Sequence, residues 1–132
     1  MNNFSLDDKN FLIISESTPL IDGICSRLRT QGAKIEFCPS GFQAISLLEE
    51  KLKANPRPYD LAIITDECED MPPREILGLM RVNIDKHKLP ILIFGKERDP
   101  DAIMQLLYEE ANGYLLDYKN FSKVIEKIKG II

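Results

Sequence analysis

Residues 59–67 read YDLAIITDE, and the five residues Leu61–Thr65 at the centre of this stretch decide the expected fold. The run is apolar at consecutive positions, which is typical of a parallel strand covered by helices on both faces. The breaker NPRP at 55–58 precedes it, and a polar loop from Asp66 to Pro73 follows it. This pattern predicts a buried parallel strand that ends at Thr65.

Similar runs recur on both sides of this strand, each followed by apolar residues at helical spacing. The other expected strands are Phe11–Ser15, Lys34–Cys38, Ile91–Phe94 and Tyr114–Asp117. Residues suited to cap the helices are Thr18, Ser40, Asp70, Asp99 and Asn120, and those suited to end them are Gly32 and Gly113. Five βα units predict an α/β fold, a doubly wound five-stranded parallel sheet in a three-layer sandwich. We expect one domain over residues 10–132, after a loose N-terminal tail at 1–9.

Composition excludes several partners and compartments. The net charge is −4, and the one basic group, Lys119, Lys123, Lys127 and Lys129, is interpreted as a solvated helix face, so no direct nucleic-acid binding is expected. No run approaches the roughly 18 apolar residues of a membrane helix, so no membrane partner is expected. Three cysteines without a CxxC pair indicate neither a disulfide framework nor a zinc site and fit a cytoplasmic location. Among them, Cys68 lies in a polar loop, where a thiol is open to reaction.

Familiar catalytic motifs are absent from the sequence. The segment after the first strand, SESTPLIDG at 15–23, is not the glycine-rich loop of a dinucleotide site or P-loop. A GxSxG elbow is missing, and the lone His87 is poorly placed to be the base of a triad. In an open parallel sheet, ligands bind beyond the carboxyl ends of the strands. The residues at those ends are Ser15, Glu16, Thr65, Asp66, Glu67, Gly95, Lys96, Asp117 and Tyr118.

The segments FLIISES, YDLAIITDE, LPILIF and NGYLL together resemble the receiver domains of bacterial two-component response regulators, which are CheY-like and flavodoxin-like in fold. The resemblance spans Asn10 to Ile132. It implies two acidic residues after strand one that hold Mg²⁺, and an aspartate ending strand three that accepts the phosphoryl group. It also implies a hydroxyl after strand four and a lysine after strand five that bind the phosphoryl oxygens.

The sequence departs from this pattern at each reacting position. The acidic pair falls on Ser15 and Glu16, the acceptor on Thr65, the hydroxyl on Gly95 and the lysine on Asp117. A carboxylate at the lysine position would repel a phosphoryl group. We therefore expect a pseudo-receiver that is not an enzyme, has no catalytic residues, takes part in no phosphorelay chemistry of its own, and needs no cofactor or metal.

Two alternatives stay open. In the first, Asp66 accepts a phosphoryl group with Mg²⁺, helped by an acidic or metal-binding cluster of Glu16, Asp66 and Glu67. Against it stands side-chain alternation, because a shift of one residue along a strand turns the side chain to the other face. In the second, the domain senses a small molecule in a pocket lined by Glu16, Thr65, Gly95 and Asp117.

The expected function is protein–protein interaction. Tyr114 falls on an aromatic position that, in switchable receivers, moves inward as the hydroxyl residue reorients. With Gly95 in the hydroxyl position that trigger is missing, so Tyr114 is interpreted as a fixed packing or contact residue. The resemblance implies a homodimer or a protein partner on the face formed by the fourth helix, the fifth strand and the fifth helix.

Overall fold

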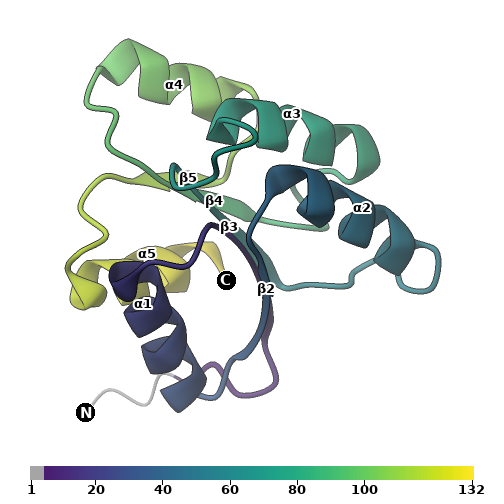
Figure 1. The fold of residues 1–132 in the computed structure, drawn as a ribbon, viewed down its shortest axis with the longest axis horizontal. Coiled ribbons are helices and arrows are strands. Elements are labelled where there is room, and N and C mark those ends of the chain that lie inside the picture. Colours follow the sequence, from purple (N-terminus) through teal and green to yellow (C-terminus); the bar gives the residue numbers. More distant parts are fainter. Residues whose placement is uncertain (1–4) are drawn as a thin grey trace.

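The computed structural model describes residues 5–132, which form five alternating strands and helices (Figure 1). The strands are β1 (Asn10–Ile14), β2 (Lys34–Cys38), β3 (Leu61–Thr65), β4 (Ile91–Phe94) and β5 (Gly113–Leu115). The helices are α1 (Pro19–Thr30), α2 (Gly41–Leu52), α3 (Pro73–Asn83), α4 (Pro100–Tyr108) and α5 (Phe121–Ile131). All strand pairs are parallel, in the order β2-β1-β3-β4-β5. The predicted fold class is confirmed.

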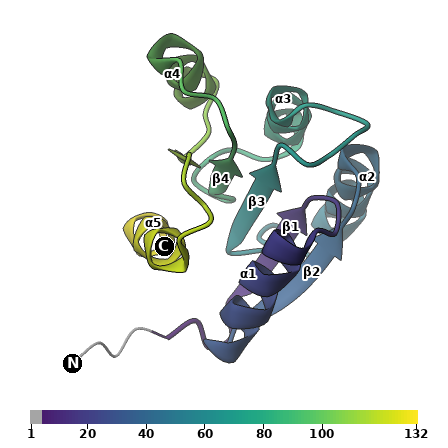
Figure 2. The same cartoon turned by 60° about the vertical axis from the view of Figure 1, so that its left-hand side comes forward.

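The sheet separates two apolar layers. Helices α1 and α5 lie on one face, and α2, α3 and α4 lie on the other (Figure 2). Successive residues of β3 point into opposite layers. Leu61 and Ile63 pack with α1 and α5. Ala62 and Ile64 pack with α2 and α3. This alternation determines which side chains meet beyond the end of β3.

Local caps explain where the helices begin. Hydrogen bonds from backbone amides to Thr18, Ser40, Asp99 and Asn120 confirm those four as N-caps. The expectation for Asp70 is wrong: α3 is preceded by Pro72 and has no side-chain cap, while the Asp70 carboxylate accepts hydrogen bonds from the amides of Gly41 and Phe42. Asp70 therefore helps Ser40 to cap α2, whose first residue lies 29 positions earlier in the chain.

Two expectations near the C-terminus also need correction. Helix α4 ends at Tyr108, and the left-handed turn after it is made by Glu110, at φ 77°, so Gly113 does not end the helix. Gly113 is instead the first residue of β5, which runs only to Leu115. This strand lies at one edge of the sheet and pairs with β4 alone. Gly32, at φ 103°, follows α1 as predicted.

The chain packs from Leu6 onward, earlier than expected. Leu6 is fully buried, and its amide donates to the carbonyl of Gln31 at 3.0 Å. Leu6 is therefore not part of a loose tail, although the expected tail at 1–9 included it. Residues 1–4 of that tail lie outside the described part of the chain. Within residues 5–132, no helix is long and apolar enough to cross a membrane.

Candidate functional site

The hydroxyls of Ser15, just after β1, and Thr65, the last residue of β3, bond to each other at the ends of these strands. Both residues are fully buried. The Thr65 hydroxyl donates to Ser15 Oγ at 2.6 Å, and Ser15 Oγ donates to the carbonyl of Glu16 at 2.9 Å. The amide of Glu67 donates in turn to Thr65 Oγ1 at 3.2 Å. The two side chains satisfy each other, and no buried side-chain polar atom in residues 5–132 lacks a partner.

The structure does not assemble the expected acidic cluster. Asp66 directly follows β3 and lies at the border of a cavity between α3 and α4, and its Oδ1 accepts a hydrogen bond from the Tyr118 hydroxyl. Glu67 pairs with Lys96 at 3.4 Å. Across the described part of the chain, no three His, Cys, Asp or Glu residues are grouped so that they could hold a metal ion. The described residues therefore offer no group of three carboxylates for the divalent cation that the receiver pattern implies.

Asp117 lies at an open surface after β5. Its carboxylate pairs with Lys123 at 3.3 Å, and about half of each side chain is exposed. It lines a hollow of about 510 Å³ together with Lys96, Arg98 and Lys119. Neither Glu16 nor Thr65 lines this hollow, so the expected four-residue pocket does not form there.

Tyr114 occupies the space that a side chain at position 95 would need. A Cβ built on Gly95 would lie 2.7 Å from the Tyr114 hydroxyl oxygen, closer than real Cβ atoms come to a neighbour. The hydroxyl donates to the carbonyl of Glu97 at 3.0 Å. Burial raises the pKa of Tyr114. The aromatic ring is thus held over the end of β4, and the glycine is what makes room for it.

Tyr118 links the two faces of the sheet at this edge. Its ring stacks on Phe94 with centroids 5.2 Å apart, and its hydroxyl donates to Asp66 Oδ1 at 3.1 Å. Burial, followed by the charge of Asp66, raises its pKa to about 12. The tyrosine therefore stays a hydrogen-bond donor at neutral pH and orients the Asp66 carboxylate.

Cys68 is not the reactive loop thiol that the sequence suggests. Its side chain is 8% exposed. Burial, with smaller contributions from Asp70 and Glu16, raises its pKa to about 11. A thiol with this pKa is almost wholly protonated at neutral pH and is a poor nucleophile.

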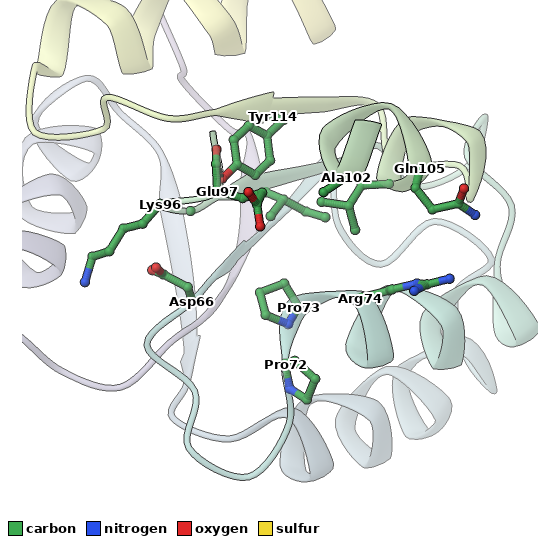
Figure 3. A pocket seen from close by; sticks show the side chains of 12 residues that line it. Asp66, Pro72, Pro73, Arg74, Lys96, Glu97, Ala102, Gln105 and Tyr114 are labelled. Carbon is green, nitrogen blue, oxygen red and sulfur yellow. Dashed lines mark hydrogen bonds between the residues drawn. The ribbon is translucent and has the colours of Figure 1, made fainter. Parts of the chain in front are cut away.

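A cavity of about 350 Å³ opens between α3 and α4, beyond the ends of β3, β4 and β5 (Figure 3). Of the four residues expected to line one pocket, only Gly95 lines this cavity. Sequence reasoning placed Asp66, Lys96 and Tyr114 near the strand ends but missed the residues from the two helices. Those missed are Pro72, Pro73, Arg74, Ala102, Gln105 and Leu106. The nearest sequence signal was the combination of Gly95 and Tyr114, which marks a space that the Tyr114 ring fills.

Comparisons with known proteins agree on the fold. No family model matches the chain, and no curated protein matches it. The chemotaxis response regulator CheY4 of Vibrio cholerae superposes with a TM-score of 0.80 at 18% identity, covering 94% of this chain and 98% of that one. A two-component response regulator from Clostridium difficile gives 0.78 at 20% identity, with 94% and 95% covered. The Mn²⁺-bound form of response regulator Rcp1 gives 0.72 at 19% identity, with 93% and 91% covered.

These likenesses define the class of fold. The chain has the CheY-like fold of the receiver domains of two-component response regulators, a five-stranded parallel sheet between two helical layers. In the Rcp1 structure a receiver of this fold holds a metal ion. In this chain the ends of β1 and β3 carry the Ser15–Thr65 pair, and residues 5–132 contain no group of three His, Cys, Asp or Glu that could hold a metal ion.

Proposed function

We propose that this chain is a receiver-fold signalling module that works without aspartyl phosphorylation and acts by binding a second copy of itself. Its surface for this contact is formed by α4, β5 and α5. The observation that carries the proposal is that α4 exposes large apolar side chains and has no buried residue. The module is taken to be residues 10–132 with Leu6 added, and three buried free cysteines suit a reducing, cytoplasmic compartment.

The strand ends support the loss of phosphotransfer. Thr65 stands where the receiver pattern puts the accepting aspartate, and its hydroxyl is already used in a bond to Ser15. A buried threonine without an adjacent base is a poor nucleophile. Asp117 stands where the pattern puts the lysine, so this position supplies no cation for phosphoryl oxygens, and its carboxylate is paired with Lys123. These features favour a module that is not an enzyme.

The outer surface of α4 has the composition of an interface. Met104 is 63% exposed, Tyr108 84% and Leu107 37%. Methionine and tyrosine are among the residues enriched at protein interfaces, and exposed tyrosines are frequent binding hot spots. Their place on one nine-residue helix gathers them into a single patch.

The charges of the two helices favour a two-fold arrangement. Helix α4 contains Asp101 and no basic residue and leads into Glu110, while the carboxylate of Glu109 is already paired with Arg74. Helix α5 carries three lysines and one glutamate. In a two-fold dimer the same surface meets itself in reverse, so that α4 of one copy can face α5 of the other. The acidic α4 of each copy then faces the lysine-bearing α5 of the other, and this contact occurs twice in the interface.

Self-association can be measured by sedimentation velocity over a range of concentrations. We expect a concentration-dependent dimer that Tyr108→Glu weakens about tenfold or more, because it places a charge in the apolar patch. Val82→Glu is the matched control, since Val82 is 82% exposed on α3, outside this surface. A wild-type chain that stays monomeric at every concentration would overturn the proposed dimer.

Phosphorylation independence has its own test. The chain is incubated with acetyl phosphate and Mg²⁺, and with beryllofluoride and Mg²⁺, and followed by intact mass and by amide NMR shifts. We expect no added mass and no Mg²⁺-dependent shift near Thr65 or Asp66. A phosphoryl adduct on Asp66 would establish the alternative of an active receiver that uses this residue.

A further inference from the structure

The cavity between α3 and α4 has the walls of a small-molecule site. Two prolines at the start of α3 form one wall, Ala102 on α4 faces them, and the ring of Tyr114 lies behind (Figure 3). Ile93 and Leu106 are the other apolar residues that line it. The volume of about 350 Å³ falls within the range of roughly 300–1,000 Å³ typical of ligand pockets, at the small end.

The cationic side chains at the rim of the cavity already have partners. Arg74 forms a two-pronged pair with Glu109, at 2.6 Å between Nη2 and Oε1 and 2.8 Å between Nε and Oε2. Lys96 pairs with Glu67, and Figure 3 shows its side chain extending away from the cavity. Each cation therefore already has a carboxylate partner, which reduces its attraction for an anionic ligand.

The carboxylates keep unused acceptors. Asp66 Oδ1 accepts the hydroxyl of Tyr118, while Oδ2 receives no hydrogen bond from any residue in 5–132. Glu97 uses one oxygen for the amides of Arg98 and Asp99. Counting the rim side chains with their partners, four carboxylates face two cations, so the surroundings of the cavity are negative.

We propose that this cavity binds a small organic cation with a flat apolar body. The body lies between the prolines and Ala102 against the Tyr114 ring, and a protonated amine or amidinium donates to Asp66 Oδ2. A charge-assisted hydrogen bond of this kind is about twice as strong as a neutral one. The site lies beneath α4 and is separate from the outer α4 surface proposed for self-association.

Benzamidine is a suitable probe, with neutral benzamide and anionic benzoate as its near-isosteric controls. Titration of the ¹⁵N-labelled chain should give saturable amide shifts at Gly95, Ala102 and Tyr114 with benzamidine. Benzamide should bind about tenfold more weakly, and benzoate should leave these three amides unshifted. Equal binding of benzamide, or no saturable shift with benzamidine, would overturn the proposal.

Two variants separate charge from shape. Asp66→Asn keeps an acceptor for Tyr118 and should weaken benzamidine about tenfold. Asp22→Asn is the matched control, since this α1 carboxylate also accepts a hydroxyl, that of Ser17, and it lies outside the cavity. Ala102→Leu should fill the cavity and abolish the shifts. Unchanged affinity in both Asp66→Asn and Ala102→Leu would place the bound benzamidine elsewhere and reject the site.

Discussion

Helix α3 lies between α2 and α4 on the same face of the sheet, and its contacts with them differ. The α2–α3 contact, the closed seam, is tightly packed, whereas the α3–α4 contact, the α3–α4 seam, contains a cavity. Along the α2–α3 seam, Gly41 lets the backbone of α2 come so close that an added Cβ would lie 2.7 Å from Ile76 Cγ1. The carboxylate of Asp70 also caps α2 across this seam. Along the α3–α4 seam there is the cavity, with the exposed Arg74–Glu109 ion pair near it.

The difference teaches what anchors a helix in this fold. Both seams share α3 and the same sheet, so the cavity between α3 and α4 follows from what α4 contributes. Helix α2 buries Gly41, Ala44 and Leu48, whereas α4 buries no residue. The helix that carries the exposed patch is thus the one least fixed to the core. A partner on its outer side and a ligand on its inner side would each stabilise its position.

The largest expected difference in stability comes from truncating one side chain to alanine in each seam. Ile76→Ala, in the closed seam, should lower the free energy of unfolding by about 3 kcal/mol because the residue is fully buried. Leu106→Ala, beside the cavity, should cost about 1 kcal/mol, since Leu106 is only partly buried. Urea unfolding followed by circular dichroism measures both. Equal losses would mean that the α3–α4 seam is packed as tightly as the other.

Adding volume should have opposite effects on the two seams. Ala44→Leu, where Ala44 is 1% exposed in α2, should cost about 2 kcal/mol through overpacking. Ala102→Leu extends into the cavity and should leave stability unchanged or raise it by about 0.5 kcal/mol. Thermal unfolding of the two variants beside the wild type makes the comparison. A clear loss for Ala102→Leu would show that the cavity closes in solution.

The fold could be predicted because its signals are local. The run LAIIT at Leu61–Thr65 and the caps at Thr18 and Ser40 each involve only a few neighbouring residues. The cap made by Asp70 was assigned to the wrong helix, because its partners Gly41 and Phe42 are adjacent only in space.

The site was less predictable than the fold for a related reason. The strand ends identified Ser15, Thr65 and Gly95, but not that the two hydroxyls bond to each other. The cavity depends on how far α4 stands from α3 after packing, and no short pattern encodes that distance. The combination of Gly95 and Tyr114 did not reveal the cavity either, because the ring of Tyr114 fills the space beside the glycine.

Two glycine-to-alanine substitutions should change the free energy of unfolding by smaller amounts and in opposite directions. Gly41→Ala should cost about 1–2 kcal/mol, because the new methyl group meets Ile76 in the closed seam. Gly78→Ala is the matched control: it lies within α3 with nothing within 4 Å of an added Cβ, and should gain about 0.5–1 kcal/mol. Chemical unfolding of both variants tests the difference. A gain at Gly41 would contradict the close approach of α2 to α3.

The smallest expected effect on stability concerns the carboxylate charge of Asp70, which caps α2 across the closed seam. Hydrogen bonds from the amides of Phe42 and Gly41 lower the pKa of Asp70, so its stabilisation is complete above the unfolded pKa of about 4 and is lost as pH falls through the folded pKa. Asp70→Asn should cost about 0.5–1 kcal/mol at pH 7, and the difference from wild type should shrink below about pH 4.

Glu69→Gln is the control for this prediction, because Glu69 is the neighbouring exposed carboxylate and makes no hydrogen bond or ion pair within residues 5–132. Urea unfolding at pH 3, 5 and 7 gives the three differences directly. A cost for Asp70→Asn that is the same at all three pH values would assign the effect to the shape of the side chain. The α2–α3 seam would then be held by the close approach at Gly41, without help from the carboxylate charge.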